Sequence, residues 1–566
     1  MPSAGIARTA LRGSGRRRIR GVGLALPHDD QDASETLMIS LRVVMRHEAH
    51  DIRLAERPRN QTFEPLDRRR NGVRRITLSF TQAPQITVLG VVTHDRVTSL
   101  AACLKSYIDC CRRYARTPEY VVMNDVIDDN VAGTTSVRAA LRAVRASEDV
   151  TIRYAGSSEK RRFAARLARE SLIARDIIDF ALFGDPRCRL LTGANRNGLL
   201  LDTVGSLVFS TDDDTLARTF RAPESSNEVS FSVEDEPREF WFFPDRRAAL
   251  EAVPPTDSDL LACHERFLGR PLTEIGGPAG MEGRVVLTLP GLVGDSGMGS
   301  PHVLLTLSAG SRSRLLASQA AYLSALRSRE MLRTVHQPTI AASSFCMTTF
   351  FGFDNRQLLP PFFPVARNSD GIFGLTVQRS IEGSHVAFLP SALLHAPPEP
   401  RRFAGDEAWT EPKRVRMADI LIAAILVHDA ASAAGGPSAR LHRLGQYLRE
   451  LASLKSEDFE AFLRTAQQLR TMAFTALLET RLREHSDGPA FWADDVRRAI
   501  AFLRGTATRN DYIVPRDLGN AGDEEDTRRL TQQLVAKFGQ LLETWPALVE
   551  AASRLRAKDC RVSVPV

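Results

Sequence analysis

Three consecutive aspartates, Asp212, Asp213 and Asp214, follow the apolar run Ser206–Ser210 with one threonine between them. Carboxylates this close together stay ionised only where cations neutralise them or where water solvates them well. A hard divalent cation such as Mg²⁺ or Mn²⁺ would satisfy their oxygens and could bridge to a diphosphate. A solvated turn or a helix N-cap would also accommodate aspartates here. The triplet by itself therefore leaves a metal site and a polar turn open.

Other polar side chains follow apolar runs in the same way. Thr93, His94 and Asp95 lie at the end of the β-branched run Ile86–Thr93, and Asp125 lies at the end of the run that begins at Tyr120. In open α/β sheets, ligands bind beyond the carboxyl ends of the strands. We therefore expect these residues and the aspartate triplet to converge on one crevice.

The elements that must position these residues alternate along the chain. Apolar strand-like runs at 86–93, 120–126 and 149–155 are separated by segments with apolar residues at helical spacing, and residues 157–182 read as one long amphipathic helix. Nearly continuous apolar strands alternating with helices predict a mostly parallel sheet with helices on both faces. We expect a basic, disordered tail over 1–75, an α/β domain over 76–405 and an α-helical domain over 406–566.

The charge distribution argues against nucleic acid as a partner. The formal net charge is +7, and residues 1–80 carry all of it, with 16 arginines, no lysine and 9 acidic residues. The charges of the remaining residues balance, and a neutral folded part argues against a nucleic-acid groove as its main function.

Other features of the sequence bear on its location. No apolar run reaches the roughly 18 residues that span a bilayer. The seven cysteines are scattered without a CxxC pair, which favours a reducing, cytoplasmic setting over a disulfide framework.

Three motifs in order resemble the family 2 glycosyltransferases of the GT-A fold. Arg196 and Asn197 are followed by Gly205, nine residues after the arginine, and then by Asp212 at the family's spacing for its acidic DxDD-type motif. Upstream, VVTHDR is similar to the family's first strand ending, with Thr93, Asp95 and Arg96 in the matching places. VVMNDV is similar to the second strand ending, with Asp125 where an aspartate holds the nucleotide base. The resemblance implies a GT-A type, Rossmann-like sheet.

The resemblance also implies roles for these residues. Asp212 would face the ribose or a metal-bound water, Asp214 would coordinate Mn²⁺ or Mg²⁺, and Asp213 would be the variable middle position. Thr93, Asp95 and Asp125 would bind the nucleotide, while Arg196 and Asn197 would lie near it and order the acidic loop. A turn or helix contact is the alternative for Asn197.

Glycosyl transfer needs a base for the acceptor hydroxyl, and the family supplies an acidic residue that opens a helix. Asp370 in ARNSDGIFG is the best match, although serine replaces the usual acidic first member of the pair and the interval from Asp214 is long. Asp295 and Asp354 are competitors. His395 fits the histidine that completes the metal shell in many relatives, with His385 as the alternative. Arg401 and Arg402 could hold phosphate oxygens, but arginines are too frequent here to assign them.

The sequence therefore predicts a metal-dependent glycosyltransferase that moves a sugar from a nucleotide-diphosphate donor to an acceptor hydroxyl. The resemblance implies a single inverting displacement, and the acceptor could be a glycan, a peptide or a small molecule. Two alternatives stay open: a nucleotidyltransferase on the same fold, whose usual glycine- and lysine/arginine-rich loop THDRVTS lacks, and a non-catalytic scaffold that binds through its helical part.

Overall fold

The computed structural model describes residues 84–125, 132–307, 309–404, 415–428, 435–507, 514–518 and 523–566. The predicted tail over 1–75 lies outside these residues.

The sheet begins with four strands that run parallel, in the order β3-β2-β1-β4. Their bounds are β1 Ile86–Thr93, β2 Glu119–Asn124, β3 Ile152–Ala155 and β4 Leu207–Asp212. The β1 and β2 registers pair Thr93 with Asn124, and the β1 and β4 registers pair Val92 with Asp212. The carboxyl ends of these strands therefore meet at one edge, which brings their polar residues together.

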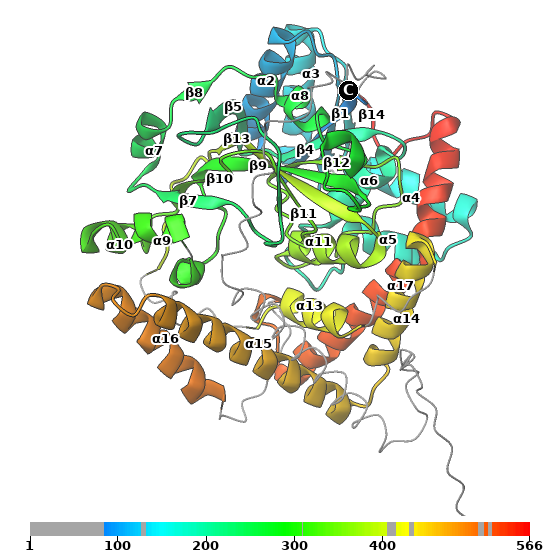
Figure 1. Cartoon of the computed structure of the whole chain (residues 1–566). Coiled ribbons are helices and arrows are strands. Elements are labelled where there is room, and N and C mark those ends of the chain that lie inside the picture. The colour runs from blue at the N-terminus through cyan, green and yellow to red at the C-terminus, as the bar shows by residue number, and fades with distance from the viewer. Residues whose placement is uncertain are drawn as a thin grey trace, which may run out of the picture.

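Helices cover both faces of this parallel part (Figure 1). Successive side chains of a strand point to opposite faces, and Leu89 and Val91 pack in one apolar cluster while Val88 and Val92 pack in the other. The first face is covered by α2 Val97–Arg113 and α3 Ala132–Glu148, and the second by α4 Ser157–Ser171, α5 Arg175–Phe183 and α6 Ala194–Asp202. The predicted α/β class, with its mostly parallel central sheet and helices on both faces, is confirmed.

The sheet continues past β4 with strands of mixed direction, in the order β12-β9-β13-β11-β6. Strand β12 pairs antiparallel with both β4 and β9, and the two long strands β9 and β13 run parallel to each other. The remaining strands are β5 Thr215–Arg221, β6 Ser230–Ser232, β7 Glu239–Phe242, β8 Pro255–Thr256, β9 Arg284–Asp295, β10 Glu330–Thr334, β11 Thr339–Ala341, β12 Phe350–Asp354, β13 Ser384–His395 and β14 Val564–Pro565.

Most of the chain beyond residue 415 is helical, as expected. These helices are α13 Met417–Val427, α14 Pro437–Ala452, α15 Ser456–Glu484, α16 Ala490–Ala507 and α17 Glu524–Ala557, and the shorter ones before them are α7 Arg246–Ala252, α8 Leu260–Glu265, α9 Ala309–Leu315, α10 Gln319–Ala325 and α11 Ser369–Ser380. Short 3₁₀ turns in the described part of the chain span Leu272–Ile275, Pro301–Thr306 and Arg516–Leu518.

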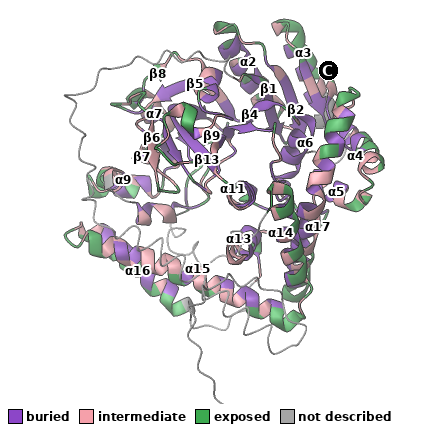
Figure 2. Cartoon of the chain, turned by 45° about the vertical axis from the view of Figure 1, so that its right-hand side comes forward, coloured by how far each residue is buried: buried purple, intermediate pink, exposed green. Residues whose placement is uncertain are grey.

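The C-terminal helices pack directly on the α/β part. Phe538 of α17 contacts Phe363 edge-on, with ring centroids 5.2 Å apart, and the indole N–H of Trp545 donates to the carbonyl of Leu359 at 2.8 Å. Both residues belong to the apolar cluster that also fills the face covered by α4, α5 and α6. Buried residues accordingly run from the sheet into α13, and the longer helices α14, α15, α16 and α17 carry a mixture of buried, intermediate and exposed residues (Figure 2).

The prediction of one helix over 157–182 is wrong, because the chain forms α4 and α5 with a break between them. Leu172 ends α4 in the left-handed region, with φ of 59°. Glu159, in the first turn of α4, accepts from the backbone N–H of Gly156 at 3.0 Å, so Gly156 is the cap residue of this helix. The break lets α5 pack closely on both α4 and α6.

A short strand closes the outer edge of the parallel part. Strand β14 pairs antiparallel with β3, where Val564 lies opposite Tyr154. The carboxylate of the fully buried Asp202 accepts from the backbone N–H of Ser563 at 2.8 Å and from a guanidinium N–H of Arg561 at 2.7 Å. These bonds fix β14 against the sheet.

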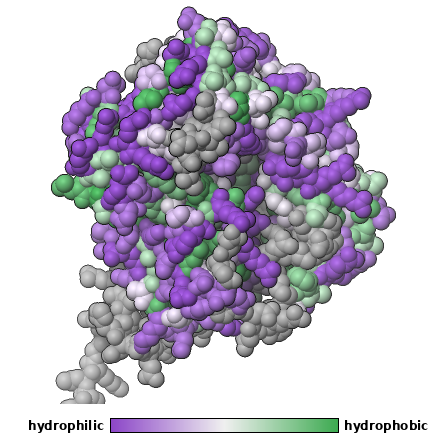
Figure 3. Space-filling view, turned by 180° about the vertical axis from the view of Figure 1, so that it is seen from behind, coloured by the Kyte–Doolittle hydropathy of each residue, from purple (hydrophilic) through white to green (hydrophobic). Residues whose placement is uncertain are grey.

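Among the described residues, no helix is both long enough and apolar enough to cross a membrane. Seen from behind, the molecule presents mainly hydrophilic residues, with hydrophobic ones scattered among them (Figure 3).

Candidate functional site

The aspartate triplet forms the turn between two strands of the sheet. Asp212 is the last residue of β4, and β5 begins at Thr215 directly after Asp214. The three side chains differ in exposure, at 27% for Asp212, 0% for Asp213 and 8% for Asp214. Only Asp212 faces outward to any extent, so the turn is not the solvated loop that the sequence left open.

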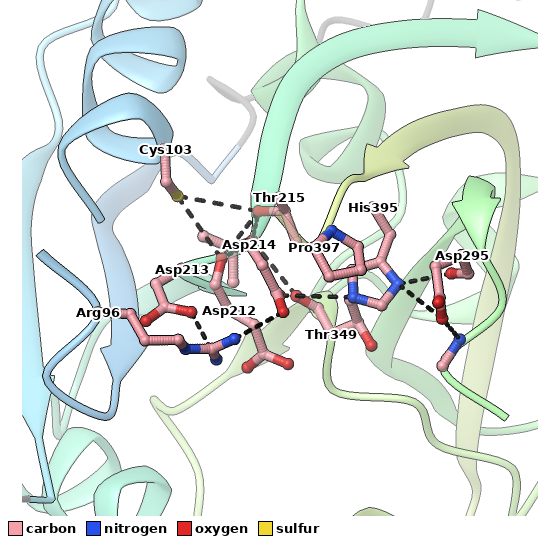
Figure 4. Close-up of polar contacts among 12 residues, drawn as sticks. Arg96, Cys103, Asp212, Asp213, Asp214, Thr215, Asp295, Thr349, His395 and Pro397 are labelled. Atoms are coloured by element: carbon pink, nitrogen blue, oxygen red, sulfur yellow. Dashed lines mark hydrogen bonds and ion pairs between the residues drawn. The ribbon is translucent and has the colours of Figure 1, made fainter. Parts of the chain in front are cut away.

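Each carboxylate of the triplet meets a guanidinium. Asp212 Oδ1 lies 2.7 Å from Arg196 Nη2, and Arg96 bridges the other two, 2.6 Å from Asp213 Oδ1 and 2.9 Å from Asp214 Oδ2. The second oxygen of Asp213 accepts from the hydroxyl of Thr93 at 2.5 Å. Arg96 and Thr93 therefore tie the end of β1 to the acidic turn, as Figure 4 shows for Arg96.

Side chains of helix α2 hold the turn in place. The hydroxyl of Tyr107 lies 3.1 Å from the hydroxyls of both Thr211 and Thr215, and Thr215 Oγ1 donates to the carbonyl of Asp212 at 2.9 Å. The thiol of Cys103 donates to the same carbonyl at 3.5 Å. This buried network fixes the backbone of the turn and so sets the direction in which its carboxylates point.

His395, the last residue of β13, lies between Asp214 of the acidic turn and Asp295, the last residue of β9 (Figure 4). Its Nδ1–H donates to the backbone carbonyl of Asp295 at 2.5 Å, and its Nε2 lies 3.4 Å from Asp214 Oδ1. The backbone N–H of Ala396 also donates to the carbonyl of Asp214 at 2.8 Å. The structure therefore brings Asp214 and His395 together, and the carbonyl of Asp295 fixes the orientation of the ring.

The surroundings shift the protonation of this cluster. Burial raises the pKa of Asp212 to about 7 against the opposing charge of Arg196, and burial raises the pKa of Asp213 to about 6 against Arg96 and Thr93. Burial would also raise the pKa of Asp214, but His395 and Arg96 hold it well below its usual range. Burial alone would lower the pKa of His395, yet the Asp214 carboxylate raises it above the ordinary value. Asp214 is thus the member of the triplet that stays ionised.

Asp370 is linked to the same site by the positive charge of Arg196. It lies in the first turn of α11, where it accepts from the backbone N–H of Gly371 at 3.1 Å and from that of Thr348. Arg196 donates to Asp212 and also to the carbonyl of Thr348 at 3.1 Å, and its charge acts on Asp370. Burial raises the pKa of Asp370, which makes this carboxylate more basic than an exposed one.

The residues expected to hold the nucleotide lie at the adjacent ends of β1 and β2. Asp95 has a left-handed backbone, with φ of 56°, and its N–H donates to the side-chain carbonyl of Asn124 at 3.3 Å. Asp125 Oδ1 lies 2.5 Å from His94 Nδ1, and this bond raises the pKa of the exposed His94. Thr93, Asp95 and Asp125 therefore lie together beside the acidic turn, and we call the part of the site that they form the nucleotide corner.

Asn197 lies away from this corner. Its amide nitrogen donates to the carbonyls of Ala181 and Phe362, at 3.0 and 2.9 Å, and its oxygen accepts from the N–H of Phe362 at 2.8 Å. The residue is fully buried, and these three bonds join α6 to neighbouring segments.

Sequence reasoning missed two residues of the site, Asn195 and Lys160. Asn195 donates to the carbonyl of Thr93 at 3.1 Å and accepts from the buried Lys160 at 2.5 Å, and Lys160 also donates to the carbonyl of Asn124 at 2.8 Å. Arg96 was noted only as part of a motif. The run of three polar residues from Asn195 to Asn197 at the start of α6 was the available signal.

The competing candidates are placed clearly by the structure. Asp295 belongs to the His395 cluster, where its carboxylate is held by Arg329 and Arg401. Asp354 pairs with Arg356 at the end of β12, and His385 bonds the carbonyl of Gly383 at the opposite end of β13 from His395. Within the described ranges, no group of three or more histidine, cysteine or acidic side chains is already arranged to hold a metal ion.

No protein-family model matches the chain, and no curated protein matches it. Among solved structures, the chain is similar to the mannosyltransferase PcManGT from Pyrobaculum calidifontis in complex with GDP-Man and Mn²⁺. The alignment covers 91% of this chain and 98% of that chain, with 13% sequence identity and a TM-score of 0.27. A likeness at this identity and TM-score carries no argument about the reaction, so any function has to be argued from the side chains of the site.

Proposed function

We propose that the chain is a metal-dependent glycosyltransferase of the GT-A type, which moves a sugar from a nucleotide-diphosphate donor to an acceptor hydroxyl. The observation that carries the proposal is the pairing of Asp214 with His395 beside Thr93, Asp95 and Asp125 at one edge of a parallel sheet. A carboxylate suits a diphosphate-bound Mg²⁺ or Mn²⁺, and a neighbouring imidazole can add a nitrogen ligand.

The donor atoms of Asp214 and His395 fit a divalent cation. Because Nδ1–H of His395 donates to the carbonyl of Asp295, the loss of the Nε2 proton would leave a neutral ring with its Nε2 lone pair directed toward Asp214, as a metal ligand requires. Two ligands of one cation, with bonds of about 2.1 Å at 90° to 110°, lie about 3.0 to 3.4 Å apart, and Nε2 lies 3.4 Å from Asp214 Oδ1. Asp212 would complete the protein ligands, directly or through water. A bound cation would neutralise the charge that develops on the departing diphosphate.

The remaining residues have roles that follow from their contacts. Thr93, Asp95 and Asp125 bind the nucleoside, and Arg196 pairs with Asp212 while its positive charge acts on Asp370. Asp370 takes the proton of the acceptor hydroxyl while the acceptor oxygen forms a bond to the sugar carbon. The bond from that carbon to the diphosphate breaks at the same time, and its electron pair leaves with the diphosphate. This is a single inverting displacement, as the family resemblance implies.

The first test is a thermal-shift screen of the full chain with uridine and guanosine diphosphate sugars, GDP-mannose included, with and without Mn²⁺. We expect at least one donor to stabilise the wild type, and Mn²⁺ to increase the shift. Asp214→Ala should lose the increase, whereas Asp494→Ala, at a 65% exposed acidic residue, should keep it. If no donor stabilises the wild type, the chain is a non-catalytic scaffold. If Asp214→Ala retains metal-dependent binding, the metal assignment is wrong.

A further inference from the structure

Two short segments beside the site place arginines next to each other. Ser328 and Arg402 form an antiparallel bridge, and the N–H of Phe403 donates to the carbonyl of Arg327 at 3.0 Å. Neighbouring positions in such a pair point to the opposite face from the bridge. Arg329 and Arg401 therefore lie side by side on one face, and Arg402 points to the other.

Both arginines form ion pairs with the same carboxylate. Asp295, which is fully buried, receives Arg329 Nη2 on Oδ1 at 3.0 Å and Arg401 Nε on Oδ2 at 2.9 Å. Burial and the positive charges of Arg401 and Arg367 lower the pKa of Arg329. Two guanidinium groups with one counter-ion leave a surplus positive charge, which costs free energy away from water unless an anion offsets it.

Arg401 is the member of the pair that a ligand can reach. Its side chain is 40% exposed, against 12% for Arg329, whose guanidinium also lies 5.7 Å from the ring centroid of Phe403. Within the described part of the chain, Asp295 is the partner of Arg401, through Nε, so both terminal nitrogens keep their N–H groups available. A guanidinium fixed through Nε presents two parallel N–H groups, which suit a phosphate or a carboxylate.

The pair lies on the side of the acidic turn that faces away from the nucleotide corner. Asp295 and His395 end β9 and β13, which are separated from β1 and β2 by β4 and β12. The loop that follows Asp295 approaches the helical region, because a Cβ atom on Gly299 would lie 3.4 Å from Arg416 Nη2. The first residues before α13, Arg416 among them, thus lie on this side.

We propose that Arg401, supported by Arg329 and Asp295, binds an anionic group of the acceptor. The acceptor class is then a hydroxyl-bearing molecule that carries a phosphate or a carboxylate. This inference rests on the proposed function, because the hydroxyl must face the donor sugar held near Asp214. Arg401 is a specificity-determining residue that recognises the acceptor, and it takes no part in the bond-breaking step.

The test uses sulfate as a probe of phosphate-like anions and acetate as a probe of carboxylates, with chloride as the ionic-strength control. Each is titrated by isothermal calorimetry into the full chain, first free and then saturated with GDP or UDP and Mn²⁺. We expect one of the two probes to bind the wild type in both states. Arg401→Gln should weaken that binding about tenfold, the loss expected for a charge-assisted pair of hydrogen bonds. The matched control Arg402→Gln should leave it unchanged.

Three results would overturn the proposal: binding of neither probe, equal weakening by both substitutions, or competition between the probe and the nucleotide. Competition would assign the arginines to the donor diphosphate. The titration of the free chain does not depend on a donor. If anions bind through Arg401 and no nucleotide binds at all, the proposed glycosyltransferase function fails and the anion site stands by itself.

Discussion

Replacement of Arg96 by methionine should strengthen the binding of Mn²⁺ to the acidic turn. Arg96 contacts Asp214 Oδ2 at 2.9 Å and Asp213 Oδ1 at 2.6 Å, so a cation that binds Asp214 has to compete with this guanidinium. Methionine keeps most of the apolar part of the side chain and removes the charge together with the hydrogen-bond donors of the guanidinium. The carboxylates then lose their fixed counter-ion, and a mobile divalent cation replaces it.

The size of the effect follows from the exposure of the pair. The Arg96 side chain is 44% exposed and that of Asp214 is 8% exposed, so the ion pair lies between a surface pair and a buried one. Surface pairs contribute up to about 1 kcal/mol, and breaking a buried pair costs about 3 to 5 kcal/mol. After the partial exposure is discounted, about 1 to 2 kcal/mol remains, which corresponds to an approximately 5- to 30-fold lower Kd for Mn²⁺.

The assay is a titration of Mn²⁺ that follows the electron paramagnetic resonance signal of the free ion, so it does not require turnover. Arg112→Met is the matched control, because Arg112 also lies on α2 and pairs with Asp109 and Glu148 at the surface. Its Mn²⁺ affinity should equal that of the wild type. An unchanged or weaker affinity in Arg96→Met would show that Arg96 does not compete with the metal, and would refute the reasoning.

Three further predictions concern individual residues. Asp370→Asn should lower the rate of sugar transfer by about 10² to 10⁴-fold with unchanged donor affinity, measured as kcat beside the donor Kd; a proportional loss of donor affinity would contradict its role as base. Asn197→Ala should destabilise the fold by about 2 to 4 kcal/mol, because three buried backbone groups lose their hydrogen bonds to this side chain. The folded variant should keep the donor affinity of the wild type. A reduced donor affinity would instead place Asn197 in the site. His264 has its pKa lowered by burial to about 3, so the unfolded chain binds its proton below about pH 6.5 while the folded chain does not. Stability should therefore fall by about 2 kcal/mol between pH 7 and pH 5 on account of this residue, and His264→Gln, compared with wild type in urea unfolding at both pH values, should lose that part of the acid sensitivity.

The sequence predicted the parallel part of the fold well, because its strands are apolar on both faces. The runs that become β1, β2 and β4 end at polar residues, and the rule that ligands bind beyond strand ends was enough to group Thr93, Asp125 and the triplet. The break after α4 was missed because Leu172 adopts a positive φ without a glycine or proline to mark it.

The orientation of side chains limited the prediction of the site. Asn195 and Asn197 lie two residues apart on α6, about 200° around the helix, so only one of them can face Thr93. Nothing in the residue types decides which one, and the structure turns Asn195 toward it. The long side chain of Arg96 likewise finds Asp213 and Asp214 only through the tertiary pairing of β1 with β4. The roles proposed for Asp214, His395 and Asp370 remain predictions.

The short strand β14 has a consequence for the behaviour of the protein in concentrated solution. The outer strand of a sheet exposes unpaired N–H and carbonyl groups, which can pair with a strand of another molecule. Here β14 occupies that position on β3, and the buried Asp202 holds it through Ser563 and Arg561. Asp202→Ala should release this strand and expose β3, so the variant should form aggregates rich in intermolecular β-structure while the acidic turn, at the opposite side of β1, stays intact.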